Sequence, residues 1–164
     1  DSEDLKQKIE EECQTCDANQ DYRLRINLSK SGEVELSRQV LAPLSPYFCQ
    51  AKLCLQESDL QQAFTYFKTS HRPHLNLGEQ EKIYHNSRGE LLETSIGNLV
   101  LKIDGKLYTP PIRLGILPGI YRQHLLETGQ VEEKILTLAD LVQAEAIYGC
   151  NAVRGLYDLQ VIGL

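Results

Sequence analysis

The feature that most limits how this chain can fold is a short turn, Asp104-Gly105, between two strand-like segments. Asn98–Ile103 precedes the turn and Lys106–Thr109 follows it, and both are rich in apolar residues. Asp-Gly favours the tight turns of β-hairpins, because the central positions of such turns need a positive φ. The two segments are therefore predicted to pair as an antiparallel hairpin, so the fold must contain a sheet.

Other strand-like and helical segments surround this hairpin. Strands are predicted at 22–28, 33–41, 47–55, 82–85, 90–93 and 156–162, and a helix at 3–16. A further helix is predicted to begin after Pro118-Gly119 and to end before Gly129. Thr137 with Asp140, three residues on, is predicted to open another helix through a capping box, and the inward-facing residues of that helix are predicted to be Leu138, Leu141, Val142 and Ile147. Residues 150–155 are predicted to form a loop. This mixture predicts an α+β fold.

A proline-rich segment divides the chain. Residues 42–46 read A-P-L-S-P, and two prolines in four positions remove backbone donors and stiffen the path. We therefore expect one unit with its linker at 1–46 and a larger unit at 47–164. The chain begins with Asp and contains no Met, which indicates that it belongs to a longer protein or has been processed.

Charge and hydropathy exclude two classes of partner. The net charge of −6 argues against nucleic acid, because phosphate binding relies on clustered Lys and Arg. No apolar run approaches the roughly 20 residues that cross a bilayer, and no signal-peptide pattern opens the chain. We expect a small-molecule partner, no membrane contact and a cytoplasmic location.

Cysteine spacing offers a weak alternative. Cys13 and Cys16 form a C-x-x-C pair, and Cys49 and Cys54 form a looser pair, so a four-thiolate zinc site can be imagined. Structural zinc sites usually present two tight pairs, and the second pair here is too widely spaced for that role. The odd total of five cysteines favours reduced thiols. We therefore predict no metal.

Three features point to one kind of chemistry. Lys68 follows an aromatic run, Glu93 ends a predicted strand, and Gly119-Ile120 opens a helix. A lysine amine can form a Schiff base, a carboxylate can bind a pyridine nitrogen, and a helix N-terminus can bind a phosphate. Taken singly, the three would be a surface lysine, an edge charge and a common helix start. Together they are what a pyridoxal 5′-phosphate (PLP) site requires.

Five sequence segments strengthen this hypothesis. In chain order they are F-K-T-S-H-R, N-S-R-G-E-L-L-E-T-S-I-G-N-L-V-L, D-G-K-L-Y-T-P-P, G-I-L-P-G-I-Y-R-Q-H-L-L and L-T-L-A-D-L-V-Q-A-E-A-I-Y-G-C-N-A-V-R-G. From Phe64 to its end the chain resembles the large domain of the fold type IV PLP enzymes. That group includes branched-chain and D-amino acid aminotransferases and 4-amino-4-deoxychorismate lyase. The strongest resemblance is to the lyase domain fused to para-aminobenzoate synthase component I.

The resemblance implies a role for each candidate residue. Lys68 would form the Schiff base and act as the general acid/base, and Glu93 would contact the pyridine nitrogen. The phosphate would be bound at four residues: Gly119, Ile120, Asn151 and Ala152. The implied fold is the large domain of the D-amino acid aminotransferase-like fold, with residues 1–46 as a remnant of the small N-terminal domain. Members of the group are usually homodimers.

The implied reaction converts 4-amino-4-deoxychorismate to para-aminobenzoate and pyruvate, a step of folate synthesis. Two alternatives remain: an aminotransferase of the same fold, and a non-catalytic fragment that serves as a scaffold or interaction module. The chain departs from the family pattern in several places. The interval between Lys68 and Glu93 is short, His71 stands where Asn is frequent, and Tyr121 stands where Thr is frequent. The upstream arginine that binds phosphate in the family is not in this sequence.

Overall fold

The computed structural model describes residues 2–46, 49–56, 63–70, 75 and 80–163. The chain divides into two compact units, 1–43 and 44–164, so the boundary lies within the A-P-L-S-P segment. Whether the first unit is the remnant of a small domain stays a prediction.

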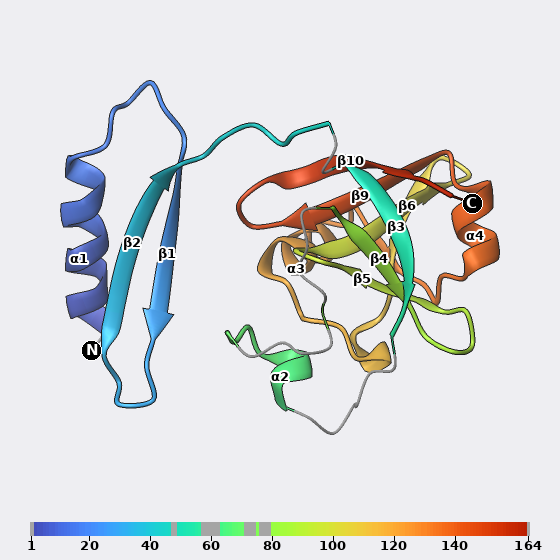
Figure 1. The fold of residues 1–164 in the computed structure, drawn as a ribbon, viewed down its shortest axis with the longest axis horizontal. Helices are drawn as coiled ribbons and strands as arrows, with labels where there is room; N and C mark the ends of the chain where they lie inside the picture. The colour runs from blue at the N-terminus through green and yellow to red at the C-terminus, as the bar shows by residue number, and fades with distance from the viewer. Residues whose placement is uncertain (1, 47–48, 57–62, 71–74, 76–79, 164) are drawn as a thin grey trace. The chain divides into compact units, whose positions relative to one another are not determined.

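The first unit is one helix and one hairpin (Figure 1). The helix is α1 (Ser2–Gln14), and the hairpin joins β1 (Tyr22–Leu28) to β2 (Val34–Val40) in an antiparallel register. Arg38 on β2 ties the hairpin to the end of α1. Its Nη1 donates to the carbonyl of Glu12 and to Oγ1 of Thr15, at 2.5 and 2.7 Å.

The second unit is built on an eight-stranded sheet in the part of the chain that the structure describes. The strand order is β5-β4-β3-β10-β9-β6-β7-β8 (Figure 1), and an additional β5–β6 pairing curls the sheet into a partial barrel. The strands are β3 (Gln50–Leu55), β4 (Lys82–His85), β5 (Leu91–Thr94), β6 (Asn98–Ile103), β7 (Lys106–Thr109), β8 (Glu132–Glu133), β9 (Ala146–Asn151) and β10 (Gly155–Val161). The helical elements are α2 (Ala63–Tyr66), the 3-10 turn η1 (Ile112–Leu114), α3 (Ile120–Glu127) and α4 (Leu138–Gln143). The predicted α+β class is confirmed.

The hairpin predicted at Asp104-Gly105 is present. β6 and β7 pair antiparallel from Leu101↔Tyr108 to Ile103↔Lys106. Asp104 has φ of 50° and Gly105 has φ of 76°, both in the left-handed region that this short turn requires.

The core of the second unit is apolar. Its largest buried cluster consists of Ala51, Ile83, Leu91, Leu99, Leu101, Leu136, Leu141, Tyr157 and Leu159. These side chains come from β3, β4, β5, β6, β10, α4 and the segment before α4, so burial of their apolar surface holds the sheet and α4 together.

The last third of the chain differs from the sequence-based prediction. The helix that begins after Thr137 ends at Gln143, Val142 is 68% exposed, and Ile147 lies in β9. Cys150, which was predicted to lie in a loop, also belongs to β9. The physical reason is that β9 pairs with β6 on one side and with β10 on the other. Ladder hydrogen bonds to two neighbours outweigh a helical apolar spacing.

Other boundaries also moved. The strand predicted at 47–55 begins at Gln50 among the described residues, and α2 covers only Ala63–Tyr66. His71 lies outside the described residues.

The start of α4 gives a testable prediction about stability. Thr137 accepts a hydrogen bond from the Asp140 N–H, and Asp140 accepts one from the Thr137 N–H at 2.8 Å, which completes the predicted capping box. Burial raises the pKa of Asp140, but hydrogen bonds from Thr137 and Lys134 outweigh it and leave the pKa below its usual value. Asp140→Ala should lower the free energy of unfolding by about 1 kcal/mol near pH 7.

The effect of Asp140→Ala should depend on pH. Because the folded-state pKa is lowered, the carboxylate stabilises the fold above its unfolded-state pKa of about 4. That contribution disappears as the pH falls through the folded-state value, so wild type and variant should converge in acid. Chemical denaturation at several pH values measures this. Asp158→Ala, an exposed control on β10, should change stability by less than about 0.5 kcal/mol. A gap between Asp140→Ala and wild type that persists unchanged in acid would contradict the prediction.

None of the helices in the described ranges has the length and apolar character needed to cross a membrane.

Candidate functional site

Glu93 is a buried carboxylate near the end of β5. Its residue is only 2% exposed, and its Oε2 accepts a hydrogen bond from the Leu117 N–H at 3.3 Å. A buried charge is costly unless hydrogen bonds or an opposite charge compensate for it. Glu93 is therefore a buried acid, unlike an ordinary glutamate at the exposed end of a strand.

Asn98, which the sequence reasoning missed, binds the same residue, Leu117, at its carbonyl. Asn98 is directly opposite Glu93 in the β5–β6 ladder, and its Nδ2 donates to the Leu117 carbonyl at 2.8 Å. Glu93 and Asn98 thus bind the N–H and the C=O of one residue. This pair fixes the 117–119 segment, which leads into α3, against the ends of β5 and β6.

Gly119 packs tightly against Asn98. A Cβ at Gly119 would lie 2.1 Å from Oδ1 of Asn98, which is far inside van der Waals contact. Gly119 has φ of −66° and ψ of 137°, so its backbone would suit other residues and close approach alone explains the glycine.

The N-terminus of α3 has the properties of an anion site. The Gly119 N–H donates to the Leu117 carbonyl at 2.9 Å, and Gly119, the N-cap, supplies no side-chain cap, so the N–H groups of the first helical turn are not satisfied by a capping side chain. The helix dipole also favours a negative charge at this end. The Ile120 side chain is 81% exposed, so what this residue offers a ligand is its backbone N–H.

Substituting Gly119 should damage the site and the fold together. Gly119→Ala is expected to cost roughly 1–3 kcal/mol of stability, because its Cβ meets Asn98 in a packed region. Asn98→Ala removes the obstructing oxygen, so the double variant should be less destabilised than the two single effects predict when summed. Thermal or denaturant unfolding of the four proteins measures the coupling. Additive effects would contradict the close contact.

Asn151 closes a turn beside this region. Its Oδ1 accepts hydrogen bonds from the N–H groups of Val153 and Arg154, at 3.0 and 2.9 Å. Asn98 pairs with Cys150 in the β6–β9 ladder, so Asn151 is one residue from the strand partner of Asn98. The Ala152 side chain is exposed in this turn.

Tyr121 links α3 to the turn after Asn151. A Cβ at Gly155 would lie 3.3 Å from the Tyr121 hydroxyl, which places that hydroxyl beside the 151–155 turn. The two segments predicted to bind phosphate therefore adjoin each other, although they are distant in sequence.

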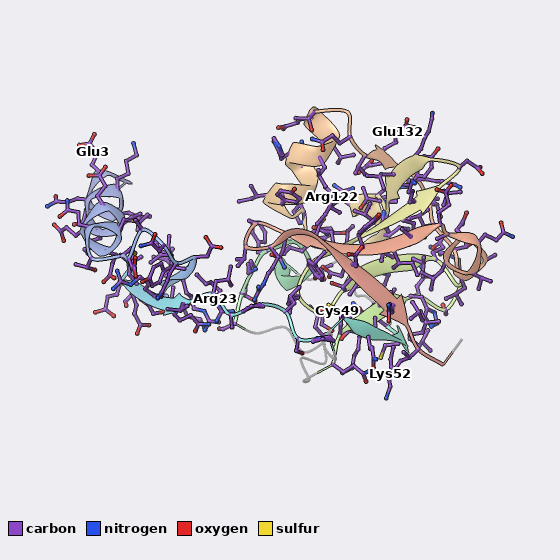
Figure 2. The ribbon with its side chains drawn as sticks, turned by 90° about the horizontal axis from the view of Figure 1, so that it is seen from above. Glu3, Arg23, Cys49, Lys52, Arg122 and Glu132 are labelled. Carbon is purple, nitrogen blue, oxygen red and sulfur yellow. The ribbon has the colours of Figure 1, made fainter. Side chains whose placement is uncertain are left out.

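Arg122, labelled in Figure 2, anchors α3 to Pro110, which follows β7, and to Glu133 on β8. It is 1% exposed, and its Nη2 donates to the Pro110 carbonyl at 2.8 Å and to Oε1 of Glu133 at 2.5 Å. Burial raises the pKa of the Cys150 thiol to about 11, although the charge of Arg122 acts in the opposite direction. Cys150 is therefore a protonated core thiol near neutral pH and not a nucleophile.

Lys68 belongs to none of the elements described above. It follows α2, which lies outside the sheet (Figure 1), and its side chain is exposed. The structure brings Glu93, Gly119, Ile120 and Asn151 into one region. The approach of Lys68 to that region stays a prediction.

The chemistry of this region suits a ligand with two different ends. The buried Glu93 carboxylate can accept a hydrogen bond from a protonated ring nitrogen, and the α3 N-terminus, which has no side-chain cap, can supply N–H donors to an anion. Leu117, two residues before Gly119, connects the two through its hydrogen bond to Glu93. A pyridine ring that carries a phosphate has the two kinds of group that these residues can bind.

Comparisons with known proteins match the chain to one family. Residues 1–162 match the family described as amino-transferase class IV. The chain is 29% identical over 123 residues to an uncharacterised protein of Haemophilus influenzae, covering 74% of this chain and 61% of the relative. It is 32% identical over 76 residues to the aminodeoxychorismate lyase of Vibrio harveyi, covering 43% of this chain and 28% of the lyase.

One solved structure has a fold similar to that of this chain. The crystal structure of a Mesorhizobium loti protein, assigned as an amino-acid aminotransferase, superposes with a TM-score of 0.75 at 32% identity. The match covers 86% of this chain and 73% of that protein. The chain spans less than two thirds of the length of the two curated relatives named above.

Proposed function

This chain belongs to the amino-transferase class IV family, whose members are PLP-dependent, and we propose that it carries the PLP site of an aminodeoxychorismate lyase. The reaction would convert 4-amino-4-deoxychorismate to para-aminobenzoate and pyruvate. The observation that supports this site best is at Leu117, whose N–H donates to Glu93 and whose carbonyl accepts from Asn98. It joins the buried acid to the start of α3.

Each protein group has a proposed task in holding the cofactor. Glu93 would accept a hydrogen bond from the pyridine nitrogen and keep that nitrogen protonated. The backbone at Gly119 and Ile120, where α3 begins, and the turn at Asn151 and Ala152 would bind the phosphate. Bound PLP supplies an electron sink for a carbanion at the substrate carbon.

Lys68 would carry out the proton transfer. Its amine would attach the cofactor in the resting protein and, once substrate has displaced it, would remove the proton beside the substrate nitrogen. Formation of the aromatic product would favour loss of the three-carbon group as pyruvate. By keeping the ring nitrogen protonated, Glu93 would stabilise the negative charge that remains when this proton is removed.

The aminotransferase reaction is the second candidate, and the similarity to the Mesorhizobium loti protein favours it. The similarity to the Vibrio harveyi lyase favours the first. Both reactions begin with removal of the same kind of proton, so the groups described above serve either one. A homodimer and a cytoplasmic location remain proposals that rest on the family resemblance.

Substrate tests separate the candidates. The purified chain, mixed with PLP, should release para-aminobenzoate and pyruvate in equal amounts from 4-amino-4-deoxychorismate without any keto acid. Conversion of a branched-chain or D-amino acid that requires a keto acid acceptor would instead support the aminotransferase. A chain that takes up no PLP at all would support the scaffold alternative and contradict both enzymes.

A further inference from the structure

A second buried carboxylate, Glu81, lies next to the turn that follows Glu93. Glu81 is 0% exposed, and its Oε1 accepts a hydrogen bond from the Ser95 N–H at 2.6 Å. Among the residues that the structure describes, no Lys or Arg forms an ion pair with it. Burial raises the pKa of Glu81, and hydrogen bonds from Thr94 and Ser95 oppose that rise. A buried carboxyl group without an ion pair lowers the stability of the fold. A task for the contact between Glu81 and Ser95 would explain why the chain has an acid here.

The turn that Glu81 contacts, residues 94–97, is fixed on its β4 side. The Ser95 N–H also reaches the Lys82 carbonyl at 3.1 Å, and the Lys82 N–H donates to Oγ of Ser95 at 3.0 Å. Within the turn, the Thr94 N–H donates to the Gly97 carbonyl at 2.9 Å, and the Gly97 N–H donates to Oγ1 of Thr94 at 3.1 Å. Glu81 and Lys82 thus hold Ser95 while Thr94 closes the turn.

The same turn rests on β9 and β10. A Cβ at Gly97 would lie 2.4 Å from the Cys150 carbonyl oxygen and 3.2 Å from the Tyr157 hydroxyl. Nδ2 of Asn151 donates to the Ile96 carbonyl at 3.4 Å. The turn therefore begins directly after Glu93 and contacts Asn151, so it connects the two ends of the proposed cofactor site.

We propose that Glu81 is a positioning residue for this site: its carboxyl fixes the 94–97 turn and, through the turn, the placement of Glu93 and Asn151. Glu81 itself does not touch the cofactor. This inference rests on the proposed function for its purpose, whereas the contact with Ser95 is independent of any cofactor. The two can therefore be tested separately.

The first experiment needs no cofactor. Amide hydrogen exchange across 94–97 is measured in wild type, Glu81→Gln and Glu81→Leu. Leucine removes the shorter of the two hydrogen bonds from the Ser95 N–H and leaves only the one to the Lys82 carbonyl, so exchange at the turn should rise at least about tenfold. Glutamine has a side chain of similar length that ends in an oxygen acceptor, so the amides of the turn in Glu81→Gln should exchange at the wild-type rate. If Glu81→Leu does not fold, Glu81→Asp, which withdraws the acceptor, replaces it. Unchanged exchange in both acceptor-deficient variants would overturn the proposal.

The second experiment measures PLP affinity by titration of the visible absorption. Glu81→Leu should bind PLP at least about tenfold more weakly than wild type, and Glu81→Gln should stay within about twofold. Leu141→Ala is the matched control, because Leu141 is 2% exposed in α4 and takes part in none of the hydrogen bonds described above for the turn. It should lower the melting temperature without changing exchange at 94–97 or PLP affinity. If Leu141→Ala lost as much PLP affinity as Glu81→Leu, the loss in Glu81→Leu would be explained by lower overall stability. That result would overturn the proposal.

Failure of the proposed function has a different signature. If wild type takes up no PLP, the proposed function is wrong and Glu81 has no cofactor site to position. The exchange experiment would still report whether Glu81 holds the turn. If wild type binds PLP and Glu81→Leu binds it equally well, the proposed function stands and the role of Glu81 is wrong.

Discussion

Lys68→Ala should leave no covalent link between PLP and the chain. In the proposed site only the Lys68 amine condenses with the cofactor aldehyde, so borohydride should fix PLP to wild type and not to the variant. Mass spectrometry of the intact chain, followed by peptide mapping, measures this. Because Lys68 would also move the substrate proton, turnover should fall by on the order of 10³-fold or more.

Lys52→Ala is the control for Lys68→Ala. Lys52 is an exposed lysine on β3 (Figure 2) and has no place in the proposed site. Its substitution should leave borohydride fixation and turnover unchanged. Covalent loading of Lys68→Ala at the wild-type level, or loss of loading in Lys52→Ala, would contradict the assignment of the Schiff base to Lys68.

Glu93→Gln should separate cofactor binding from catalysis. Glutamine can still accept the hydrogen bond from the Leu117 N–H, so the fold and much of the PLP affinity should persist. A neutral amide cannot keep the pyridine nitrogen protonated, so kcat should fall by about 10²- to 10⁴-fold. Steady-state kinetics and PLP titration of the same preparation measure the two effects.

Two further variants test the reasoning on Glu93. Glu93→Ala leaves the Leu117 N–H without this acceptor in a buried site and should also cost about 1–3 kcal/mol of stability. Glu132→Gln is the control, because Glu132 is exposed on β8 and pairs with the exposed Lys106. It should change neither kcat nor stability appreciably. Wild-type kcat in Glu93→Gln would contradict the role proposed for the acid.

Features set by neighbouring residues were predictable from the sequence. The Asp104-Gly105 hairpin, the start of α3 after Gly119 and the capping box of Thr137 and Asp140 all follow from chemistry within a few positions. Each of these elements appears where it was predicted. The family resemblance added the fold, which local patterns alone could not specify.

Features set by distant contacts were not predictable. Ile147 was predicted to be an inward-facing residue of the helix that begins at Thr137 but lies in β9, because β6 and β10 pair with that strand on both sides. Asn98 bonds a carbonyl 19 residues away and Glu81 an N–H 14 residues away, and nothing beside either residue in the sequence signals those partners. Buried polar contacts of this kind depend on the assembled sheet.

The central claim is that Glu93 and the start of α3 hold opposite ends of one cofactor ring. A crystal structure of the chain with PLP bound tests this most directly. It should place the pyridine nitrogen about 3 Å from the Glu93 carboxylate and the phosphate against the backbone of Gly119 and Ile120 at the start of α3. PLP bound elsewhere on the chain, or with its phosphate away from α3, would contradict the account.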